Sequence, residues 1–466
     1  MTDADLRGQR VLVMGIGRRA GGVGVIRYAV EAGAEVRVTD RGDPEDFRAV
    51  VDEFRDTTVE FVLGRHDEAD FEWADVVVRN PDVRRDSPFL AVAERHGARI
   101  EMEMTLFLRA CPAPTIGVTG TKGKTTTTML VHSILAQRWP ATVVAGNMGR
   151  SALAHLGDVQ AGVPVALELS SFQLEGIGEH RLAPTVAVLT NVCPDHLDRY
   201  PDVAAYAATK GQIVQHQTPD EWKVFPDDDA TVSSLVAGTP ARPVTFSAER
   251  SNGDRALFVA DGQLVARWEG SELDLGPVAA LRVPGAHNVR NALAAAGAAL
   301  AAGADASDVR AGLARFAGVA HRLELVATVG DVAFVNDSTA TTPAAAVAAL
   351  AAFPDRPIVA LAGGSDKGLD LEPLAAALGR HARAVVLLDG TATPALRARL
   401  GDAPVHGPYP SMAAALRQAV ALASPGSVVL LSPGCASFGL FVDEFDRGDQ
   451  FRAAVRDLDA SAVTQT

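Results

Sequence analysis

Short apolar runs alternate along most of the chain with longer segments whose apolar residues recur at helical spacing. Near the start, the runs Arg10–Met14 and Glu35–Val38 flank a helical segment, and Ala74–Arg79 is a third run of the same kind. Alternation of strands and helices is typical of α/β layers with mostly parallel sheets. The beginning of the chain therefore predicts a βαβ unit whose sheet continues with Ala74–Arg79.

Two further series of apolar runs follow a proline-containing break at Cys111-Pro-Ala-Pro114. The second series contains Thr115–Val118, Val163–Leu169 and Thr185–Thr190, and the third contains Val332–Val335, Ile358–Ala362, Ala384–Leu388 and Ser427–Leu431. Within 256–267, Asp261-Gly262 stands between two β-like runs and predicts a hairpin. We expect three α/β domains, at 1–112, 113–319 and 320–466.

Length and charge narrow the class of protein. The chain has 466 residues, of which 48% are apolar, and single cores rarely grow beyond about 250–300 residues, so several domains are expected. The formal charge of −14 opposes a nucleic-acid or anionic-membrane partner, because both need a positive field. The longest apolar tract, Ala292–Ala302, is too short to span a bilayer and predicts a buried helix.

Cysteine and lysine are both scarce. Three cysteines, Cys111, Cys193 and Cys435, lie far apart and form no metal-binding spacing, as is typical of proteins in a reducing compartment. We expect a cytoplasmic monomer with no membrane or nucleic-acid partner. The 43 basic residues include only five lysines, so some of these are expected where an arginine cannot replace an amine. They are Lys122, Lys124, Lys210, Lys223 and Lys367.

The clearest candidate site is GVTGTKGKTTTT (117–128), between a predicted strand and a predicted helix. Glycines let backbone amides approach phosphate oxygens, and a helix N-terminus favours negative charge. Lys124 would add a cation near the β- and γ-phosphates, and Thr125 could place its hydroxyl on Mg²⁺. The match to GxxxxGK[ST] is incomplete, because Val118 occupies the first glycine position. We predict a nucleotide phosphate site.

The segment GTKGKTT resembles the phosphate loop of the muramyl ligases and their folylpolyglutamate synthetase relatives, and further motifs follow in that family's order. The resemblance implies three domains: an N-terminal Rossmann-like domain for UDP-sugar, a central P-loop ATPase domain with a parallel sheet, and a C-terminal Rossmann-like domain. It also implies ATP-dependent addition of D-glutamate to UDP-N-acetylmuramoyl-L-alanine through an acyl phosphate, in peptidoglycan biosynthesis. ATP, the UDP-sugar peptide and glutamate are the expected small-molecule substrates.

Three further segments suggest a catalytic centre with two magnesium sites. ALELSSFQLE (166–175) resembles the segment whose glutamate, here Glu168, holds magnesium, and NVCPDHLDRY (191–200) would bring His196 to a second ion, with Asp195 and Asp198 as weaker candidates. Lys210 occupies the place of a lysine that the family carries as a carbamate, an oxygen anion of the kind Mg²⁺ prefers. The implied catalytic set is Lys124, Asn147, Glu168, His196 and Lys210, and the implied metal set is Thr125, Glu168, His196 and carbamylated Lys210.

The resemblance also assigns residues around the two nucleotides. The implied ATP set is Gly120, Thr121, Lys122, Gly123, Lys124, Thr125, Thr126, Asn288, Asn291, Arg322 and Asp337. At the N-terminus, GIGRRA (15–20) fits G-x-G-x-x-[GA] and would bind the UDP pyrophosphate, while RNPDV (79–83) departs from the family pattern. There Asp82 replaces a glycine, and it should point away from the diphosphate. The implied UDP-sugar set is Gly15, Gly17, Asp40, Arg41, Asn80, Asn147 and Ser170.

Two C-terminal segments, GGSDKGLD (363–370) and LSPGCASFGLF (431–441), resemble those that hold the incoming amino acid. The implied glutamate set is Thr341, Lys367, Ser437 and Phe438. Thr339 stands where many members have lysine, and the segment after Ser437 is altered, so that the aromatic pocket residue is displaced to Phe445 or replaced by Glu444. These departures leave D- and L-glutamate open.

Alternatives to a D-glutamate ligase follow from parts of the same motif set. An L-glutamate ligase would use the same site, and folylpolyglutamate synthetase is disfavoured because it lacks the N-terminal βαβ domain. An NAD-dependent oxidoreductase using Gly15 and Gly17 would leave GTKGKT, Glu168 and Lys210 without a role. A P-loop regulator would leave the amino-acid motifs unexplained. ADP release that requires both a UDP-sugar peptide and an amino acid distinguishes these classes.

Overall fold

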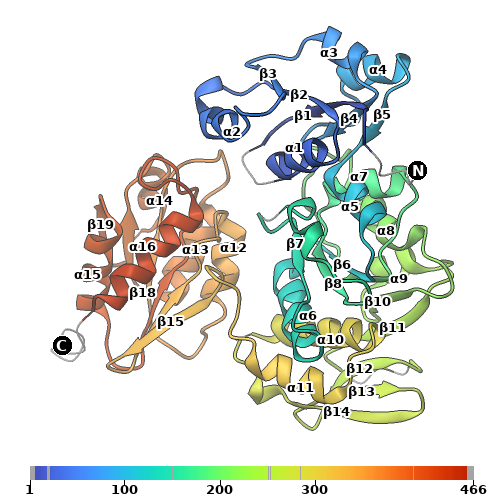
Figure 1. Ribbon diagram of the computed structural model, residues 1–466. Helices are drawn as coiled ribbons and strands as arrows, with labels where there is room; N and C mark the ends of the chain where they lie inside the picture. Colours follow the sequence, from blue (N-terminus) through green and yellow to red (C-terminus); the bar gives the residue numbers. More distant parts are fainter. Residues whose placement is uncertain are drawn as a thin grey trace. The chain divides into compact units, whose positions relative to one another are not determined.

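The computed structural model describes residues 6–17, 21–149, 151–249, 251, 253–283, 285–401 and 403–458. The chain forms two compact units (Figure 1). The first extends to Phe316, apart from 283–285, and contains the N-terminal and central sheets. The second contains the remaining sheet, and we call residues from 317 onward the C-terminal unit. Each unit is described by itself.

The N-terminal sheet is wholly parallel, with strand order β3-β2-β1-β4-β5. Its order reverses between β1 and β4, and ligands of such sheets bind beyond the carboxyl ends of the strands at this point. The strands are β1 (Arg10–Met14), β2 (Glu35–Asp40), β3 (Glu60–Leu63), β4 (Val76–Arg79) and β5 (Arg99–Glu101). The helices are α1 (Gly21–Glu31), α2 (Arg48–Glu53), α3 (Glu68–Trp73), α4 (Pro88–Arg95) and α5 (Glu103–Ala110), with the 3₁₀ turn η1 (Pro44–Phe47).

The central sheet has the order β14-β13-β12-β11-β10-β9-β6-β8-β7 in the described residues. It is parallel from β7 to β12, and an antiparallel ribbon completes it. The strands are β6 (Thr115–Thr119), β7 (Val144–Gly146), β8 (Val165–Glu168), β9 (Val186–Leu189), β10 (Trp222–Pro226), β11 (Arg242–Phe246), β12 (Ala256–Ala260), β13 (Gln263–Trp268) and β14 (Ser271–Pro277). The helices are α6 (Lys124–Arg138), α7 (Ser171–Glu179), α8 (Val203–Gln215), α9 (Ala230–Val236), α10 (Ala286–Ala301) and α11 (Ala306–Arg315), with 3₁₀ turns η2 (Leu153–Asp158) and η3 (Val278–Ala280).

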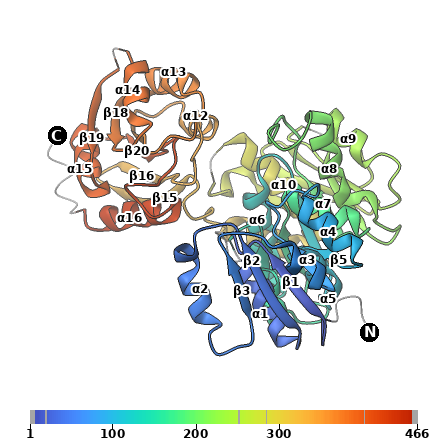
Figure 2. The ribbon, with the colours of Figure 1, turned by 90° about the horizontal axis from the view of Figure 1, so that it is seen from above.

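The C-terminal unit is a three-layer sandwich with strand order β15-β16-β20-β17-β18-β19. Only β15 runs antiparallel to its neighbour among the described strands of this sheet. Helices α12, α13 and α14 cover one face and α15 and α16 the other (Figure 2). The strands are β15 (Glu324–Val329), β16 (Val332–Asn336), β17 (Ile358–Ala362), β18 (Ala382–Leu388), β19 (Val405–Tyr409) and β20 (Val428–Leu431). The helices are α12 (Pro343–Leu350), α13 (Glu372–His381), α14 (Thr393–Arg399), α15 (Met412–Leu422) and α16 (Glu444–Arg456).

Burial explains why the apolar runs form these strands. All five residues of β6 are buried, as are those of β16 and β17, because helices cover both faces of a parallel sheet. The alanine-rich tract forms the buried part of α10, as predicted. The predicted hairpin is also present, with Ala260 paired to Gln263 across Asp261-Gly262. No helix in the described residues is long and apolar enough to cross a membrane.

The three-domain α/β class with mostly parallel sheets is confirmed, and every predicted strand has a counterpart. The sequence missed several strands, and the reasons are local. β5 has only three residues, while β11 (RPVTF) and β19 (VHGPY) both contain proline, which lowers the expectation of a strand. The boundaries near 112 and 319 remain a proposal, since α5 and β6 lie in one compact unit.

Candidate active site

The phosphate-loop candidate links β6 to α6, as predicted. Gly123 caps α6 with a φ of 83°, and Lys124 is the first residue of the helix. Lys124 Nζ donates hydrogen bonds to the carbonyl oxygens of Gly120 (3.0 Å) and Thr121 (3.1 Å), so the amine folds back over the loop. Gly120 has a φ of 150°, and a Cβ there would lie 1.9 Å from Thr190 Oγ1. The loop therefore has the glycines, the helix end and the cation that phosphate binding requires.

A second loop, at the carboxyl end of β9, is hydrogen-bonded to the phosphate loop. The Lys122 backbone amide donates to Asn191 Oδ1 (2.9 Å), and Thr121 Oγ1 donates to the Cys193 carbonyl (3.1 Å). Lys122 Nζ lies 3.7 Å from Asp195 Oδ2. Since β9 pairs with β6 directly, the loops that follow these two strands lie side by side.

Glu168 ends β8 on the other side of β6 and is 2% exposed. Its Oε1 accepts a hydrogen bond from Asn147 Nδ2 (2.9 Å). Its Oε2 is buried and has no hydrogen-bond partner in the described part of the chain. An unpartnered carboxylate oxygen in a buried position is costly unless a cation meets it. The structure thus brings together Glu168 and Asn147, both predicted for the catalytic centre.

His196 lies in the β9 loop with a left-handed backbone (φ 53°) and an exposed side chain. Its ring lies 5.1 Å from the Phe172 ring and 6.0 Å from the Tyr206 ring. Its backbone amide donates to Asp195 Oδ1 (3.0 Å), which occupies one oxygen of that weaker candidate. Asp198 is exposed in the same loop. Within the described ranges, no group of three or more His, Cys, Asp and Glu side chains is arranged to hold a metal ion.

Lys210 lies in the middle of α8 and is 1% exposed, unlike an ordinary surface lysine. Its Nζ lies 4.8 Å from the centroid of the Tyr206 ring. Burial and the neighbouring charge of Lys124 lower the pKa of Lys210 to about 7, although Asp195 and Glu168 act in the opposite direction. Lys210 therefore shares one electrostatic environment with the phosphate loop and the buried glutamate. Near neutral pH a large fraction of this amine is uncharged.

The predicted asparagines of α10 approach the phosphate loop. Asn291 Nδ2 donates to Asn288 Oδ1 (3.0 Å), and both residues are buried. A Cβ on Gly123 would lie 2.4 Å from Asn291 Oδ1, so only glycine fits between the loop and this side chain. Of the threonines that follow Lys124, Thr125 is half-buried and Thr126 is buried.

One charged cluster was missed by sequence reasoning. Glu175, on α7, accepts hydrogen bonds from Arg199 Nε (2.9 Å) and Nη2 (2.7 Å) and from the Tyr200 hydroxyl (3.0 Å). Arg79, at the end of β4, is 1% exposed, and its Nη2 lies 3.5 Å from Glu175 Oε2. Arg199 Nη1 also donates to the Asp82 carbonyl (3.2 Å). Glu175 thus joins the 79–83 segment to the loop that carries His196. The Asp198-Arg199 pair within NVCPDHLDRY is the sequence feature that could have predicted this cluster.

The N-terminal glycine turn follows β1 and is held by hydrogen bonds to Asp40 and Thr39. Gly15 and Gly17 have φ values of 88° and 70°, and Asp40 Oδ2 accepts the backbone amide of Ile16 (2.7 Å). Asn80 lies against the turn, since a Cβ on Gly17 would be 2.6 Å from Asn80 Nδ2. Gly15 and Asn80 follow β1 and β4, the strands between which the sheet order reverses. The predicted Gly15, Gly17, Asp40 and Asn80 therefore come together.

Other predicted UDP-sugar residues are less closely grouped. Arg41, after β2, and Asp82 are both exposed. Ser170 Oγ accepts the Gln173 backbone amide (3.2 Å) and donates to Gln173 Oε1 (3.0 Å), so it caps α7. The end of the predicted GIGRRA motif, 18–20, lies outside the described residues.

In the C-terminal unit, Arg322 is exposed and Asp337 is 5% exposed. Asp337 Oδ1 accepts the Leu323 backbone amide (3.1 Å), and Oδ2 accepts the Ser432 hydroxyl (2.8 Å). Burial raises the pKa of Asp337 to about 6, although the Ser432 and Leu323 hydrogen bonds oppose this shift. Both carboxylate oxygens of this predicted ATP ligand are therefore engaged inside the domain.

Asp337→Asn is expected to stabilise the folded protein above about pH 6. The folded pKa of Asp337 is about 6 and its reference value is 3.8, so the folded state holds the proton more tightly and wild-type stability falls as pH rises between these values. Asparagine removes this dependence, with a gain of at most about 3 kcal/mol. Thermal unfolding should show no advantage of the variant at pH 4 and a growing one up to pH 6. An advantage that stays constant with pH would contradict this expectation.

Two predicted glutamate-site residues meet directly, because Lys367 Nζ donates to Thr341 Oγ1 (3.1 Å). Ser437 is 2% exposed, and its Oγ has no hydrogen-bond partner among the described residues. Phe438 is 49% exposed beside it. An unpartnered buried hydroxyl next to an exposed aromatic ring and a nearby amine is an arrangement that can receive a small polar ligand.

The altered segment after Ser437 begins α16. Phe445 packs edge-on against the His321 ring, with 5.7 Å between centroids. The carbonyl of Glu444 accepts the Ser338 hydroxyl (2.7 Å), and Thr339 Oγ1 donates to the His321 carbonyl (2.8 Å). Phe445 and Thr339, noted as departures from the family pattern, both contact His321.

These features define a nucleotide-binding α/β protein, in which a phosphate loop adjoins a buried carboxylate and a buried lysine. Three domain models of one known protein family match this chain. The Mur ligase middle domain matches residues 118–299, the glutamate ligase domain of Mur ligases matches 321–435, and the MurD-like N-terminal domain of Mur ligases matches 9–101.

Relatives match along nearly the whole chain. The UDP-N-acetylmuramoylalanine–D-glutamate ligase of Roseiflexus sp. is 45% identical over 97% of this chain and 99% of its own. The ligase of the same name from Geobacter metallireducens is 37% identical over 97% and 98%. The chain belongs to the Mur ligase family, whose members are ATP-dependent ligases. The predicted family and enzyme class are confirmed.

Solved structures agree with this fold. The UDP-N-acetylmuramate–alanine ligase of Thermotoga maritima has a TM-score of 0.59 at 22% identity and covers 96% of this chain and 99% of its own. The MurF ligase of the same organism, solved in complex with ADP, has a TM-score of 0.57 at 18% identity over 98% and 97%. At these identities the likeness shows the shared fold.

Proposed function

We propose that this protein is an ATP-dependent ligase that adds D-glutamate to UDP-N-acetylmuramoyl-L-alanine in peptidoglycan biosynthesis, forming ADP and phosphate. The observation that carries the proposal is the convergence of Lys124, Glu168 and Lys210 on one environment, in a chain that matches D-glutamate ligases from end to end. The ligand classes are ATP, the UDP-sugar peptide and glutamate. A cytoplasmic, monomeric enzyme is the form we infer.

The proposed reaction proceeds in two transfers. A carboxylate oxygen of the UDP-sugar peptide attacks the γ-phosphorus of ATP, the bond to the β-phosphate oxygen breaks, and ADP leaves. The glutamate amine then attacks the acyl carbon, phosphate leaves with the bonding electrons, and the amine loses a proton. Lys124 and the N-terminus of α6 stabilise charge on the transferring phosphoryl group. Asn147, held against Glu168, would orient the phosphoryl or acyl phosphate oxygens.

The residues present fit a magnesium site. Mg²⁺ prefers oxygen ligands, and the buried, unpartnered Glu168 Oε2 offers one. Thr125, His196 and a carbamate on Lys210 would complete the two sites. When bound, Mg²⁺ would neutralise phosphate charge and polarise the phosphoryl group. The carbamate itself is supported by the burial of Lys210 and by its lowered pKa, because only an uncharged amine attacks CO₂.

The remaining substrates would occupy the other two sites. The glycine turn at Gly15 and Gly17 would lie beside the UDP pyrophosphate, with its Ile16 and Gly17 amides donated to Asp40 Oδ2. Lys367 and Thr341, with the Ser437 hydroxyl, would receive the carboxylates of glutamate. These assignments are supported by the geometry of each site and by the family's domain order.

The deciding experiment measures ADP release with UDP-N-acetylmuramoyl-L-alanine and a panel of D- and L-amino acids. We expect turnover only when both substrates are present, with D-glutamate preferred over glutamine and alanine. A clear preference for L-glutamate would overturn the stereochemical assignment, and turnover without the UDP-sugar peptide would overturn the ligase assignment.

Lys367→Ala is expected to raise the KM for glutamate about a hundredfold or more, since a carboxylate that loses its charge partner loses several kcal/mol of interaction. The KM for ATP should change little. Arg380→Ala, which removes an exposed charge from α13 of the same unit, is the matched control and should leave both constants near wild type. An unchanged KM for glutamate in Lys367→Ala would place the amino acid elsewhere.

A further inference from the structure

Arg322 lies at the tip of a strained turn in the C-terminal unit. Its two neighbours both have left-handed backbones, with φ values of 61° at His321 and 42° at Leu323. Neither neighbour is glycine, and side chains with a Cβ disfavour this region. The Arg322 backbone amide donates to the Val319 carbonyl (3.1 Å), while its side chain is exposed. Such a turn persists only when surrounding contacts hold it.

On the Leu323 side, the contact is the carboxylate of Asp337. Its Oδ1 accepts the Leu323 backbone amide, and its Oδ2 accepts the Ser432 hydroxyl. The Asp337 backbone is itself fixed, because its amide donates to the Leu431 carbonyl (2.7 Å). Asp337 therefore ties the turn to the carboxyl ends of β16 and β20, two adjacent central strands.

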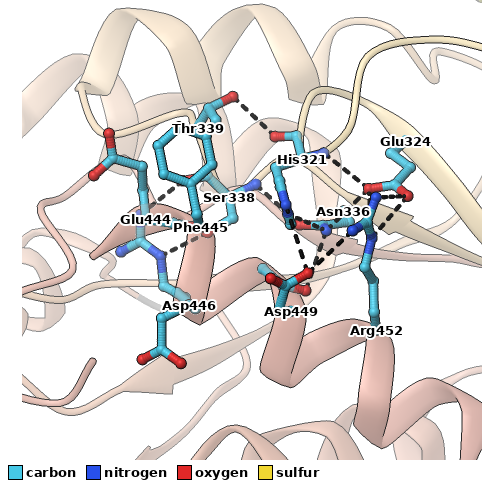
Figure 3. Close-up of polar contacts among 12 residues, drawn as sticks. His321, Glu324, Asn336, Ser338, Thr339, Glu444, Phe445, Asp446, Asp449 and Arg452 are labelled. Carbon is cyan, nitrogen blue, oxygen red and sulfur yellow. Dashed lines mark hydrogen bonds and ion pairs between the residues drawn. The ribbon is translucent and has the colours of Figure 1, made fainter. Parts of the chain in front are cut away.

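On the His321 side, the contacts surround the residue (Figure 3). The His321 backbone amide donates to Glu324 Oε2 (2.8 Å), and its carbonyl accepts from the backbone amide (3.1 Å) and the hydroxyl (2.8 Å) of Thr339. Glu324 is held by Arg452, which donates to it through Nε and Nη2. The backbone of His321 is thus fixed at both its donor and its acceptor.

The His321 ring is also locked. Asn336 Nδ2 lies 3.0 Å from His321 Nδ1, and it also lies within hydrogen-bond distance of Glu324 Oε2 (3.2 Å) and the Gly448 carbonyl (3.3 Å). A Cβ on Gly448 would lie 2.1 Å from Nδ1, which shows how closely α16 approaches the ring. Burial and the charge of Arg452 lower the pKa of His321, although Asp449, Glu324 and Asp443 oppose this. A neutral ring can accept from Asn336 at Nδ1, and the lowered pKa of His321 favours this form.

We propose that Asp337, which holds the Leu323 backbone amide, and Asn336, which holds the His321 ring, are positioning residues on the two sides of Arg322 that fix the direction in which its guanidinium leaves the domain. The proposal rests on the proposed function and on the resemblance that includes Arg322 in the ATP-binding set. A guanidinium that is oriented before binding loses less conformational freedom when it pairs with phosphate. Asp337 then acts through Arg322, and its two oxygens remain engaged in the turn.

A double-mutant cycle tests the Asp337 half of the proposal. Arg322→Ala and Asp337→Ala should each lower kcat/KM for ATP at least tenfold. The double variant should be no more than about threefold below Arg322→Ala, because a residue that acts through another adds nothing once that other is gone. If the double variant instead lost kcat/KM by the product of the two single losses, the proposal would be overturned. Asp337→Asn keeps an acceptor for the Leu323 amide and should lose less kcat/KM than Asp337→Ala, whereas a loss equal to that of alanine would overturn the role in holding the turn.

Asn336→Ala tests the other half, and the same cycle with Arg322→Ala applies. The expected loss is again at least about tenfold and not additive. Asp389→Ala is the matched control, since its carboxylate also accepts one backbone amide (Gly390, 2.8 Å) at the carboxyl end of a strand but is distant in sequence from the turn. It should change kcat/KM less than twofold, and a tenfold loss there would make the Asp337 effect unspecific.

Hydrogen exchange separates this proposal from the proposed function. The peptide spanning 319–325 should exchange faster in Asp337→Ala than in wild type, while Asp337→Asn and Asp389→Ala keep the wild-type rate. Peptides from β17 report whether the unit is still folded. If the wild-type protein released no ADP with its substrates, the proposed function would fail. Exchange at 319–325 would still show whether Asp337 holds the turn. Unchanged exchange in Asp337→Ala would overturn the positioning role.

Discussion

Lys124→Ala is expected to reduce ADP formation about a thousandfold or more with little change in folding. Lys124 begins α6, and its Nζ folds over the phosphate loop onto the carbonyls of Gly120 and Thr121. An amine placed there can follow the phosphoryl group during transfer, and removing one such preorganised charge costs about a hundred- to a thousandfold or more in rate. Steady-state ADP release and thermal unfolding are the two measurements, and near-normal ADP release would exclude the phosphate-loop assignment.

Lys122→Ala is the matched control within the same loop. The Lys122 side chain is 71% exposed, and its ion pair with Asp195 spans 3.7 Å. Exposed pairs of this kind contribute little, so the expected loss is below about tenfold. Equal losses at Lys122 and Lys124 would mean that the loop responds to total charge and not to the position of one amine.

Lys210→Ala is the second substitution with a large expected effect, a loss of about a hundredfold or more in kcat. A carbamate on Lys210 would supply an anionic oxygen beside the buried Glu168 carboxylate, and alanine cannot form it. Small carboxylates at high concentration should partly restore turnover, because they provide an oxygen anion of similar size. Lys210→Arg is the control, since it keeps a positive charge but cannot be carbamylated, and it should be equally inactive. Full activity of either variant would refute the modification.

Carbamylation should also depend on pH in a defined direction. The pKa of Lys210 is lowered to about 7 from 10.5, so the uncharged amine becomes abundant as pH rises from about 6 to about 8. Labelling with ¹³C-bicarbonate should give a carbamate signal that grows over this range and is absent from Lys210→Ala. A signal that stays constant, or that persists in the alanine variant, would contradict the assignment.

Many strands could be predicted from apolar runs in the sequence, because the central strands are buried on both faces. β6, β16 and β17 have no exposed residue, so their sequences are nearly continuous apolar runs. Edge and near-edge strands lack this property. β15, for instance, has a burial pattern that mixes exposed and half-buried positions, and its residues ELVATV carry no strong strand signal by themselves.

The site was predictable to the extent that its chemistry is local in sequence. The phosphate site could be predicted from GTKGKTT alone, because the glycines, the lysine and the start of the helix lie within seven residues. The burial of Lys210 and the unpartnered oxygen of Glu168 were not predictable, since both depend on packing between α8 and distant strands. The hydrogen bond from the Leu323 backbone amide to Asp337 was also not predictable. A carboxylate in a motif associated with nucleotide binding is first interpreted as a ligand contact, not as an acceptor for a backbone amide.

The distribution of lysines has a practical consequence for handling the protein. Lys210 and Lys223 are buried, and Lys124 is folded over the phosphate loop. The exposed lysines are Lys122, beside that loop, and Lys367, in the proposed glutamate site. Coupling of lysine side chains to a surface, a dye or a cross-linker should therefore occur first at Lys122 and Lys367, next to the phosphate loop and in the proposed glutamate site. Labels intended to leave turnover intact are better directed to an introduced cysteine on the exposed face of a helix such as α13, once the exposed Cys193 beside the phosphate loop has been replaced.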